Sequence, residues 1–172
     1  MKNMRFFTSF RMTEKKGFTL IELLVVVAII GILATISSVS LTQARRRARD
    51  TRRISDIQQI RNGLVIYANQ RATYPPADSS SYPTATLTLG VDVGCLDDTN
   101  EGFKTANTCT NGLEIMKKVP AEQVPAPRAQ YTYSKTASSA YTITFQLDGP
   151  IADLSGGNCT ATVEGITCVP VP

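Results

Sequence analysis

The chain of 172 residues contains no histidine and no tryptophan. Histidine titrates near neutral pH and is the commonest general acid or base in enzymes. Its absence excludes a Ser/His/Asp or Cys/His catalytic group and every histidine-bound metal. No other catalytic constellation is recognisable in the sequence. We therefore expect a protein that is not an enzyme.

Charge is unevenly distributed along the chain. Residues 1–17 contain five basic groups and one acid, which accounts for the formal net charge of +4. Residues 45–71, here called the stem, contain eight Arg and two Asp, and residues 72–172, here called the head, contain five basic and ten acidic groups. Without residues 1–17 the chain would be neutral overall, with a positive stem and a negative head.

A long apolar segment follows the basic N-terminus. Residues 23–44 are 22 consecutive uncharged positions, and about 20 apolar residues suffice to cross a bilayer core of roughly 30 Å. The small residues near the end of this segment are interleaved with Ile and Leu, and they fit a signal-peptidase site poorly. The segment therefore predicts a membrane span, and a simple signal anchor is one explanation of it.

Glu22 lies near the start of this span. A carboxylate in a membrane span costs roughly 2.5–3.5 kcal/mol on insertion scales, and the uncut chain offers it no obvious partner. Cleavage of the Gly17–Phe18 bond would create an ammonium group on Phe18, about one helical turn before Glu22. A neighbouring chain could present the same group. Glu22 is therefore explained if the chain is cut after Gly17 and the cut chains then pair in the membrane.

The segment GFTLIE, residues 17–22, follows two lysines and precedes the apolar segment. This pattern resembles the signal of type IV pilins and type II secretion pseudopilins. The resemblance implies that a prepilin peptidase cuts after Gly17, that Phe18 becomes the N-methylated terminus, and that Glu22 guides assembly. Many pilins have a proline where this chain has Val39, so local melting of the helix there stays an open question.

We consider three functions, of which the first is the prediction that the resemblance favours and the other two are its alternatives. The first is a structural subunit of a type IV pilus-like filament, and the second is a pseudopilin of a type II secretion system. The third is a signal-anchored binding protein that never polymerises. For a filament subunit, the resemblance implies a precursor that crosses the bacterial cytoplasmic membrane once, with its head outside. It also implies self-assembly with the help of a platform protein and a motor.

Six arginines lie within nine residues of the stem: Arg45, Arg46, Arg47, Arg49, Arg52 and Arg53. Clustered arginines can bind nucleic-acid phosphates. No aromatic residue is interleaved among them for base stacking, so we expect no nucleic-acid partner. Two explanations stay open, which are contact with anionic lipid headgroups and contact with the acidic face of another subunit.

Apolar residues in the stem recur at helical spacing. They are Ile54, Ile57, Ile60, Leu64 and Tyr67. Because no proline interrupts residues 18–74, we predict one helix over residues 19–70, which ends before Pro75-Pro76. The expected fold class is α+β, with a long N-terminal helix whose second half packs on a small antiparallel β-sheet head. The expected regions are a cleaved leader 1–17, a membrane and filament-core helix 18–44, the stem and the head.

Alternating residues in the head predict two β-hairpins. AQYTYSK and AYTITFQLD flank a Thr/Ala/Ser turn, and CTATVEGITCV forms the second candidate. We expect three to five antiparallel strands, and a short helix over residues 113–118. The stretch PPADSSSYPTAT is expected to form a surface loop.

All four cysteines lie beyond the predicted membrane span: Cys95, Cys109, Cys159 and Cys168. An even number in an exported head predicts two disulfides, and four cysteines allow three pairings. We favour the local pairs, Cys95 with Cys109 and Cys159 with Cys168. The second pair would close a C-terminal loop, as the resemblance to pilins implies. If these two residues lie directly opposite each other, the turn centres between Val163 and Glu164.

Asp97 and Glu101 are candidates for a calcium site, because their spacing resembles the start of an EF-hand loop. The twelfth position of that loop is Thr108, where an EF-hand has a bidentate glutamate. We therefore expect a polar loop closed by a disulfide and no cofactor, and calcium stays open as the alternative.

Overall fold

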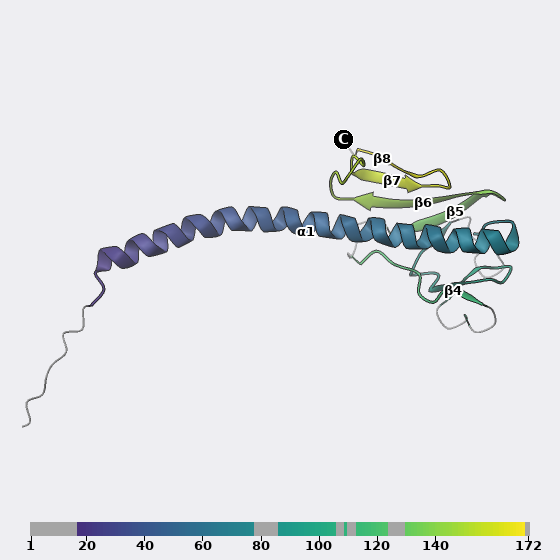
Figure 1. Cartoon of the computed structure of the whole chain (residues 1–172), viewed down its shortest axis with the longest axis horizontal. Coiled ribbons are helices and arrows are strands. Elements are labelled where there is room, and N and C mark those ends of the chain that lie inside the picture. The colour runs from purple at the N-terminus through teal and green to yellow at the C-terminus, as the bar shows by residue number, and fades with distance from the viewer. Residues whose placement is uncertain (1–16, 78–85, 106–108, 110–112, 124–129, 171–172) are drawn as a thin grey trace, which may run out of the picture. The chain divides into compact units, whose positions relative to one another are not determined.

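The computed structural model describes residues 17–77, 86–105, 109, 113–123 and 130–170 (Figure 1). The chain divides into two compact units, residues 1–41 and 42–172. Residues 1–16 of the predicted leader and most of the predicted loop after Pro76 lie outside the described residues.

One helix, α1, extends over Leu20–Arg71. It begins after Thr19 and ends at Ala72, which adopts a left-handed conformation with φ of 58° and donates its N–H to Ala68 O at 2.8 Å. A left-handed residue just after the last turn is a common helix ending. The prediction of a helix over residues 19–70 is thus confirmed to within one residue at each end.

The described apolar side chains of α1 in the first unit are exposed. Phe18 is 86% exposed and Leu20 is 82% exposed, and the large apolar side chains from Ile21 to Ile36 and at Leu41 are exposed as well. Among the described residues, α1 is one helix that is long and apolar enough to cross a membrane. A soluble protein seldom exposes such a large apolar surface, so this segment requires an apolar environment.

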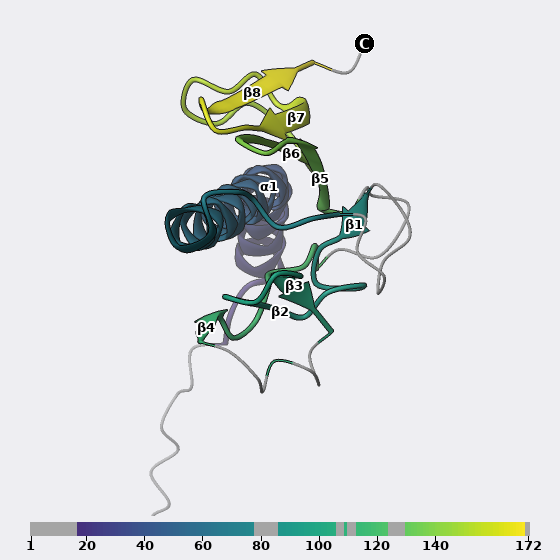
Figure 2. The same ribbon diagram turned by 90° about the vertical axis from the view of Figure 1, so that its right-hand side faces the viewer.

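The second unit contains two antiparallel sheets. The five-stranded sheet has the order β1-β5-β6-β7-β8, and the three-stranded sheet has the order β3-β2-β4. Their bounds are Leu87–Thr88 for β1, Cys95–Asp97 for β2, Phe103–Lys104 for β3, Glu114–Met116 for β4, Thr132–Ala137 for β5, Ala140–Leu147 for β6, Gly157–Ala161 for β7 and Ile166–Val169 for β8. Viewed along α1, the two sheets lie on opposite sides of its C-terminal half (Figure 2).

The predicted apolar stripe of the stem forms the centre of this unit. Ile57, Ile60 and Leu64 are fully buried, and Tyr67 is 1% exposed. They belong to one core with buried residues from both sheets, including Phe103 and several tyrosines. The α+β fold class is therefore confirmed, with the stem packed between two sheets rather than on one.

Both predicted hairpins are present. Strands β5 and β6 pair through Tyr133 and Ile143, and β7 pairs with β8 so that Cys159 lies directly opposite Cys168. The turn of the second hairpin is closed by a hydrogen bond from Thr162 N to Gly165 O at 2.8 Å, so it centres between Val163 and Glu164.

Two predictions about the head are wrong. Residues 113–118 contain strand β4 instead of a helix, because Glu114–Met116 pairs with β2 and places Met116 opposite Leu96. The described residues also contain eight strands, more than the predicted three to five. The additional strands have only two or three residues, which is too short for an alternating pattern.

Candidate processing and assembly site

The predicted cleavage site lies just before α1. Gly17, Phe18 and Thr19 are exposed and lie outside the helix, which starts at Leu20. The Gly17–Phe18 bond is therefore in non-helical chain, where its backbone can be reached without unwinding a helix. Glu22 follows in the first helical turn.

Thr19 and Glu22 cap the start of α1 reciprocally. Glu22 Oε2 accepts a hydrogen bond from Thr19 N at 2.9 Å and another from the Thr19 hydroxyl at 2.7 Å. Glu22 N donates to Thr19 Oγ1 at 3.4 Å. This arrangement is a capping box, which satisfies backbone N–H groups that the first turn of a helix leaves unpaired.

The capping box was missed in the sequence, although its signal was present. Thr-x-x-Glu immediately before an apolar run is the pattern of a capping box. Glu22 therefore has a partner in its own chain before any cleavage, contrary to the expectation that the uncut chain offers none. Within the described residues, Glu22 Oε1 accepts no hydrogen bond, so this oxygen can accept one from an ammonium group.

A second site joins the stem to the head through Arg53. Its Nη1 lies 2.6 Å from Asp50 Oδ1 and 3.4 Å from Asp148 Oδ2, and its Nε lies 2.8 Å from Glu122 Oε2. All four side chains are almost completely buried, at 3–4% exposure. Burial acts to lower the pKa of Arg53, but Glu122 and Asp50 outweigh it and raise the pKa.

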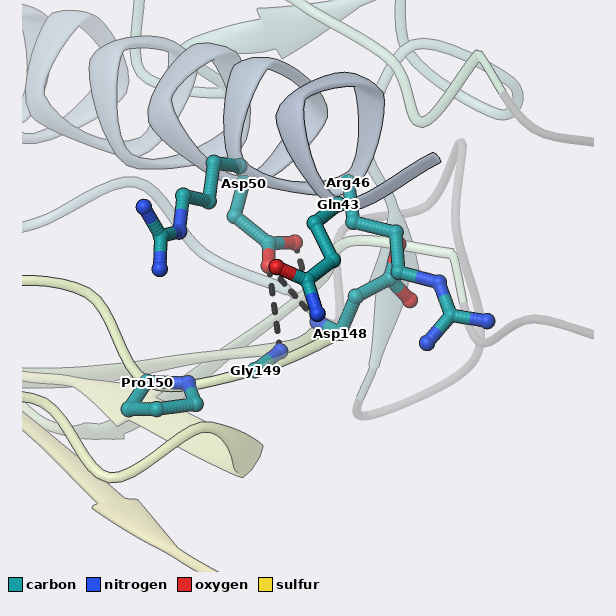
Figure 3. Close-up of a pocket in the computed structure, with 7 residues that line it drawn as sticks. Gln43, Arg46, Asp50, Asp148, Gly149 and Pro150 are labelled. Atoms are coloured by element: carbon teal, nitrogen blue, oxygen red, sulfur yellow. Dashed lines mark hydrogen bonds between the residues drawn. The ribbon is translucent and has the colours of Figure 1, made fainter. Parts of the chain in front are cut away.

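Asp50 also binds the backbone of the loop after β6. Its carboxylate accepts hydrogen bonds from Asp148 N at 2.9 Å and from Gly149 N at 3.1 Å (Figure 3). Asp50 and Arg53 lie one helical turn apart, so they attach one face of the stem to two separate parts of the head. A charge-assisted network of this kind fixes the position of the stem within the second unit.

The six clustered arginines divide into two groups. Arg45, Arg46, Arg47 and Arg52 are exposed. Arg53 is buried, and Arg49 is partly buried with its Nη2 lying 3.2 Å from Asp148 Oδ2. Among these six, the exposed group forms no ion pair with a carboxylate of the described residues, whereas Arg49 and Arg53 are paired within the chain.

The calcium candidates lie at the end of β2 and in the loop that follows it, since Asp97 is the last residue of β2 and Glu101 lies between β2 and β3. Asp97 is fully buried, and its Oδ2 lies 3.3 Å from Lys104 Nζ. Its Oδ1 accepts a hydrogen bond from Thr99 N at 3.0 Å, and Glu101 is partly buried. Among the described residues no group of three or more His, Cys, Asp or Glu is placed to hold a metal ion. The expectation of no cofactor stays a prediction, with calcium at this loop as its alternative.

Two disulfides close loops in the head. Cys95 in β2 is joined to Cys109 with a Cα–Cα distance of 6.3 Å. Cys159 in β7 is joined to Cys168 in β8 with a Cα–Cα distance of 4.0 Å. These are the two local pairs that the sequence favours, and both Cys95 and Cys159 are buried.

Comparison with known proteins concerns the N-terminal part of the chain. Residues 12–38 match the family model of the prokaryotic N-terminal methylation motif. The match includes Gly17, Phe18 and Glu22, so the residues around the predicted cleavage site carry the signal of N-methylated prepilins. No solved structure matches the chain significantly.

The relatives are both pseudopilins and pilins. The chain is 35% identical over 68 residues to type II secretion system core protein G of Vibrio cholerae, across 40% of this chain and 47% of that protein. It is 38% identical over 66 residues to the Escherichia coli protein of the same name, across 38% of this chain and 46% of that protein. It is 60% identical over 40 residues to type IV wide pilus major component PilA4 of Thermus thermophilus, across 23% of this chain and 30% of that protein.

These matches confirm the resemblance to type IV pilins and type II secretion pseudopilins. The chain spans less than half the length of each of these relatives. The similarity therefore supports a pilin-like N-terminus. The function of the whole protein is a proposal.

Proposed function

We propose that this chain is a structural subunit of a type IV pilus-like filament. The observation that carries the proposal is the methylation motif at the start of a helix whose large apolar side chains are exposed from Leu20 to Ile36 and at Leu41. Such a surface requires a membrane before assembly and neighbouring subunits afterwards. The subunit performs no catalysis of its own.

The mechanism begins with cleavage of the leader 1–17. A prepilin peptidase cuts after Gly17, and Phe18 becomes an N-methylated terminus with a positive charge. Glu22 keeps its hydrogen bonds to Thr19 and directs its second carboxylate oxygen to the ammonium of Phe18, in its own chain or in a neighbour. Charge compensation in an apolar medium is much stronger than in water, so it favours one docking position of the incoming helix.

Burial of apolar side chains then stabilises the filament. The helix of residues 18–44 leaves the lipid and packs against the same segment of other subunits, as in a helical bundle. The head stays outside, where its disulfides are stable. A platform protein and a motor supply the work, and the cytoplasmic membrane holds the precursor as a single-pass protein.

A second candidate is a pseudopilin of a type II secretion system. The observation that favours it is the similarity to core protein G, which extends over more of this chain than the similarity to PilA4. The two candidates share processing and assembly and differ in the filament that results. A binding protein anchored by an uncut signal is the third candidate, and it predicts no filament at all.

The test is deletion of the gene and complementation with the full-length protein in its own host. A pilus-like subunit is supported if surface filaments vanish on deletion, return on complementation and bind antibody against the head along their length. Loss of protein secretion with no change in surface filaments favours the pseudopilin. If the protein is abundant in membranes while neither filaments nor secretion change, both assembly functions are contradicted.

A further inference from the structure

Four exposed arginines follow the uncharged segment 23–44 directly. We call Arg45, Arg46, Arg47 and Arg52 the arginine ring, because successive residues of a helix point about 100° apart and these four face several sides of the helix. Arg49 and Arg53 are excluded from the ring, since carboxylates of the second unit pair with them. The ring therefore holds positive charge that the nearby acids do not neutralise by direct contact.

A pocket of about 270 Å³ lies beside two members of the ring. Its lining combines residues of α1 with residues of the loop after β6 (Figure 3): Gln43, Arg46, Arg47, Asp50, Asp148, Gly149 and Pro150. The acids at its base are already bonded. Asp50 accepts hydrogen bonds from two backbone nitrogens, and Asp148 pairs with Arg49. Two guanidinium groups and one amide thus remain to bind an anion of phosphate size.

The position of the ring in the chain indicates which anion it meets. A helix of 22 uncharged residues is about 33 Å long, which matches a hydrocarbon core of roughly 30 Å. The residue after this segment is Arg45, so the ring falls at the level of the lipid headgroups. One guanidinium group can donate two parallel hydrogen bonds to two oxygens of a phosphate. Arg is therefore better suited than Lys to bind a phosphate group.

Two other partners fit less well. A second copy of the chain would have to offer a group of free carboxylates. Asp50, Glu122 and Asp148 are bonded to arginines of their own chain, and the exposed acids Glu114, Asp153 and Glu164 lie on three separate segments of the head. A single-stranded nucleic acid is typically held by aromatic side chains that stack on its bases, and residues 43–53 contain none.

We propose that the arginine ring binds the phosphate groups of anionic phospholipids, in the leaflet on the same side of the membrane as the head. The pocket beside Arg46 and Arg47 seats one headgroup. The inference deepens the proposed function, because it rests on a subunit that waits in the membrane before assembly. Entry into a filament breaks these contacts, so the anionic lipid content of the membrane controls how readily subunits are released.

The test uses the full-length chain, produced without the peptidase and held in detergent micelles. Phosphatidylglycerol, phosphatidylcholine and inorganic phosphate are added separately, and native mass spectrometry measures how much of each stays bound. Wild-type chain is expected to retain phosphatidylglycerol preferentially. Loss of one arginine is expected to weaken this retention about fivefold, and Arg46→Gln with Arg47→Gln about 25-fold.

The matched control is Lys117→Gln with Lys118→Gln, which removes the same charge from exposed positions after β4. An equal loss in this control would show a general effect of net charge and overturn the site. Equal retention of phosphatidylcholine, or binding of inorganic phosphate as tight as that of the lipid, would also overturn it. If circular dichroism shows that the first double variant is unfolded, Arg45→Gln with Arg52→Gln tests the same ring.

These measurements concern an uncut and unassembled chain. A chain that forms no filaments in the host can therefore still show the predicted preference for phosphatidylglycerol in micelles. A chain that forms filaments but shows no lipid preference would overturn only the arginine ring as a lipid site.

Discussion

The carboxylate of Glu22 caps the helix that it belongs to, since its Oε2 accepts hydrogen bonds from both the backbone N–H and the hydroxyl of Thr19. This relationship gives Glu22 two tasks that can be separated. It closes the first turn of α1 before cleavage, and it can face a new ammonium group on Phe18 after cleavage.

Glu22→Ala is expected to leave membrane insertion and cleavage intact and to impair assembly. The reason is that the variant keeps the cut bond and the apolar helix but loses the carboxylate that meets Phe18. Immunoblots of membrane fractions measure cleavage, and electron microscopy counts filaments.

Thr19→Ala is the matched control for this prediction. It removes the cap, at a cost of about 0.5–2 kcal/mol at the helix start, and keeps the charge of Glu22. Filaments in normal number from Glu22→Ala would contradict the assembly role. If both variants lost filaments to the same extent, Glu22 would act through its helix cap alone.

Arg53→Met is expected to destabilise the second unit by about 3–5 kcal/mol, because it leaves buried carboxylates without their cation. Thermal and chemical unfolding of the full chain in detergent measures the loss. Arg52→Met is the control, since Arg52 is exposed and should change stability by no more than about 0.5 kcal/mol.

A double variant sharpens the same prediction. Glu122→Gln removes one of the buried carboxylates that Arg53→Met leaves without a cation. The double variant should therefore be more stable than Arg53→Met alone. A double variant that is less stable by the sum of both single effects would contradict a coupled ion network.

Asp56→Asn tests the pH dependence of the stem. Burial raises the pKa of Asp56 above its ordinary value of 3.8, although a hydrogen bond from Tyr131 opposes the shift. A raised pKa means that the folded chain takes up this proton more readily than the unfolded chain. The contribution of Asp56 to stability is therefore present at low pH and is lost as pH rises through the folded pKa.

The expected result is a difference between wild type and variant that depends on pH. Wild type should gain stability relative to Asp56→Asn as the pH falls from about 7 to about 4. Urea unfolding at several pH values measures this difference. A constant difference, or one that shrinks on acidification, would contradict the raised pKa.

Removal of either disulfide is expected to destabilise the head by about 2–3 kcal/mol. The two pairs are separated by 14 and 9 residues, and loop entropy depends only on the logarithm of loop length. Cys95→Ser with Cys109→Ser should therefore cost nearly as much as Cys159→Ser with Cys168→Ser. Differential scanning calorimetry of both double variants measures this, and no change in melting temperature from either would contradict a structural role.

Periodicity explains which parts of the fold were predictable. The stripe from Ile54 to Tyr67 has a helical period and continues without proline, and the strands of the two hairpins alternate over four or more residues. Strand β4 was predicted as a helix because its identity depends on pairing with β2, which is distant in sequence. Local patterns do not contain such long-range pairing.

The burial of Arg53 was not predicted from the sequence, for a different reason. The six arginines are chemically alike, and only their position around the helix decides which one is buried. Arg53 precedes Ile57 by four residues and Asp50 precedes Arg53 by three, so both extend the apolar stripe by helical spacing. That spacing could have identified Arg53, whereas its partners Glu122 and Asp148 could come only from the fold.

The measurement that tests processing and assembly most directly is intact mass with N-terminal sequencing of the protein from two fractions, sheared surface material and membranes. A pilus-like subunit predicts a chain that begins at Phe18 and carries one added methyl group in the sheared material. The same chain found only in membranes would favour the pseudopilin. A chain that still begins at Met1 in both fractions, while the peptidase is active, would contradict cleavage after Gly17 and the assembly role of Glu22 with it.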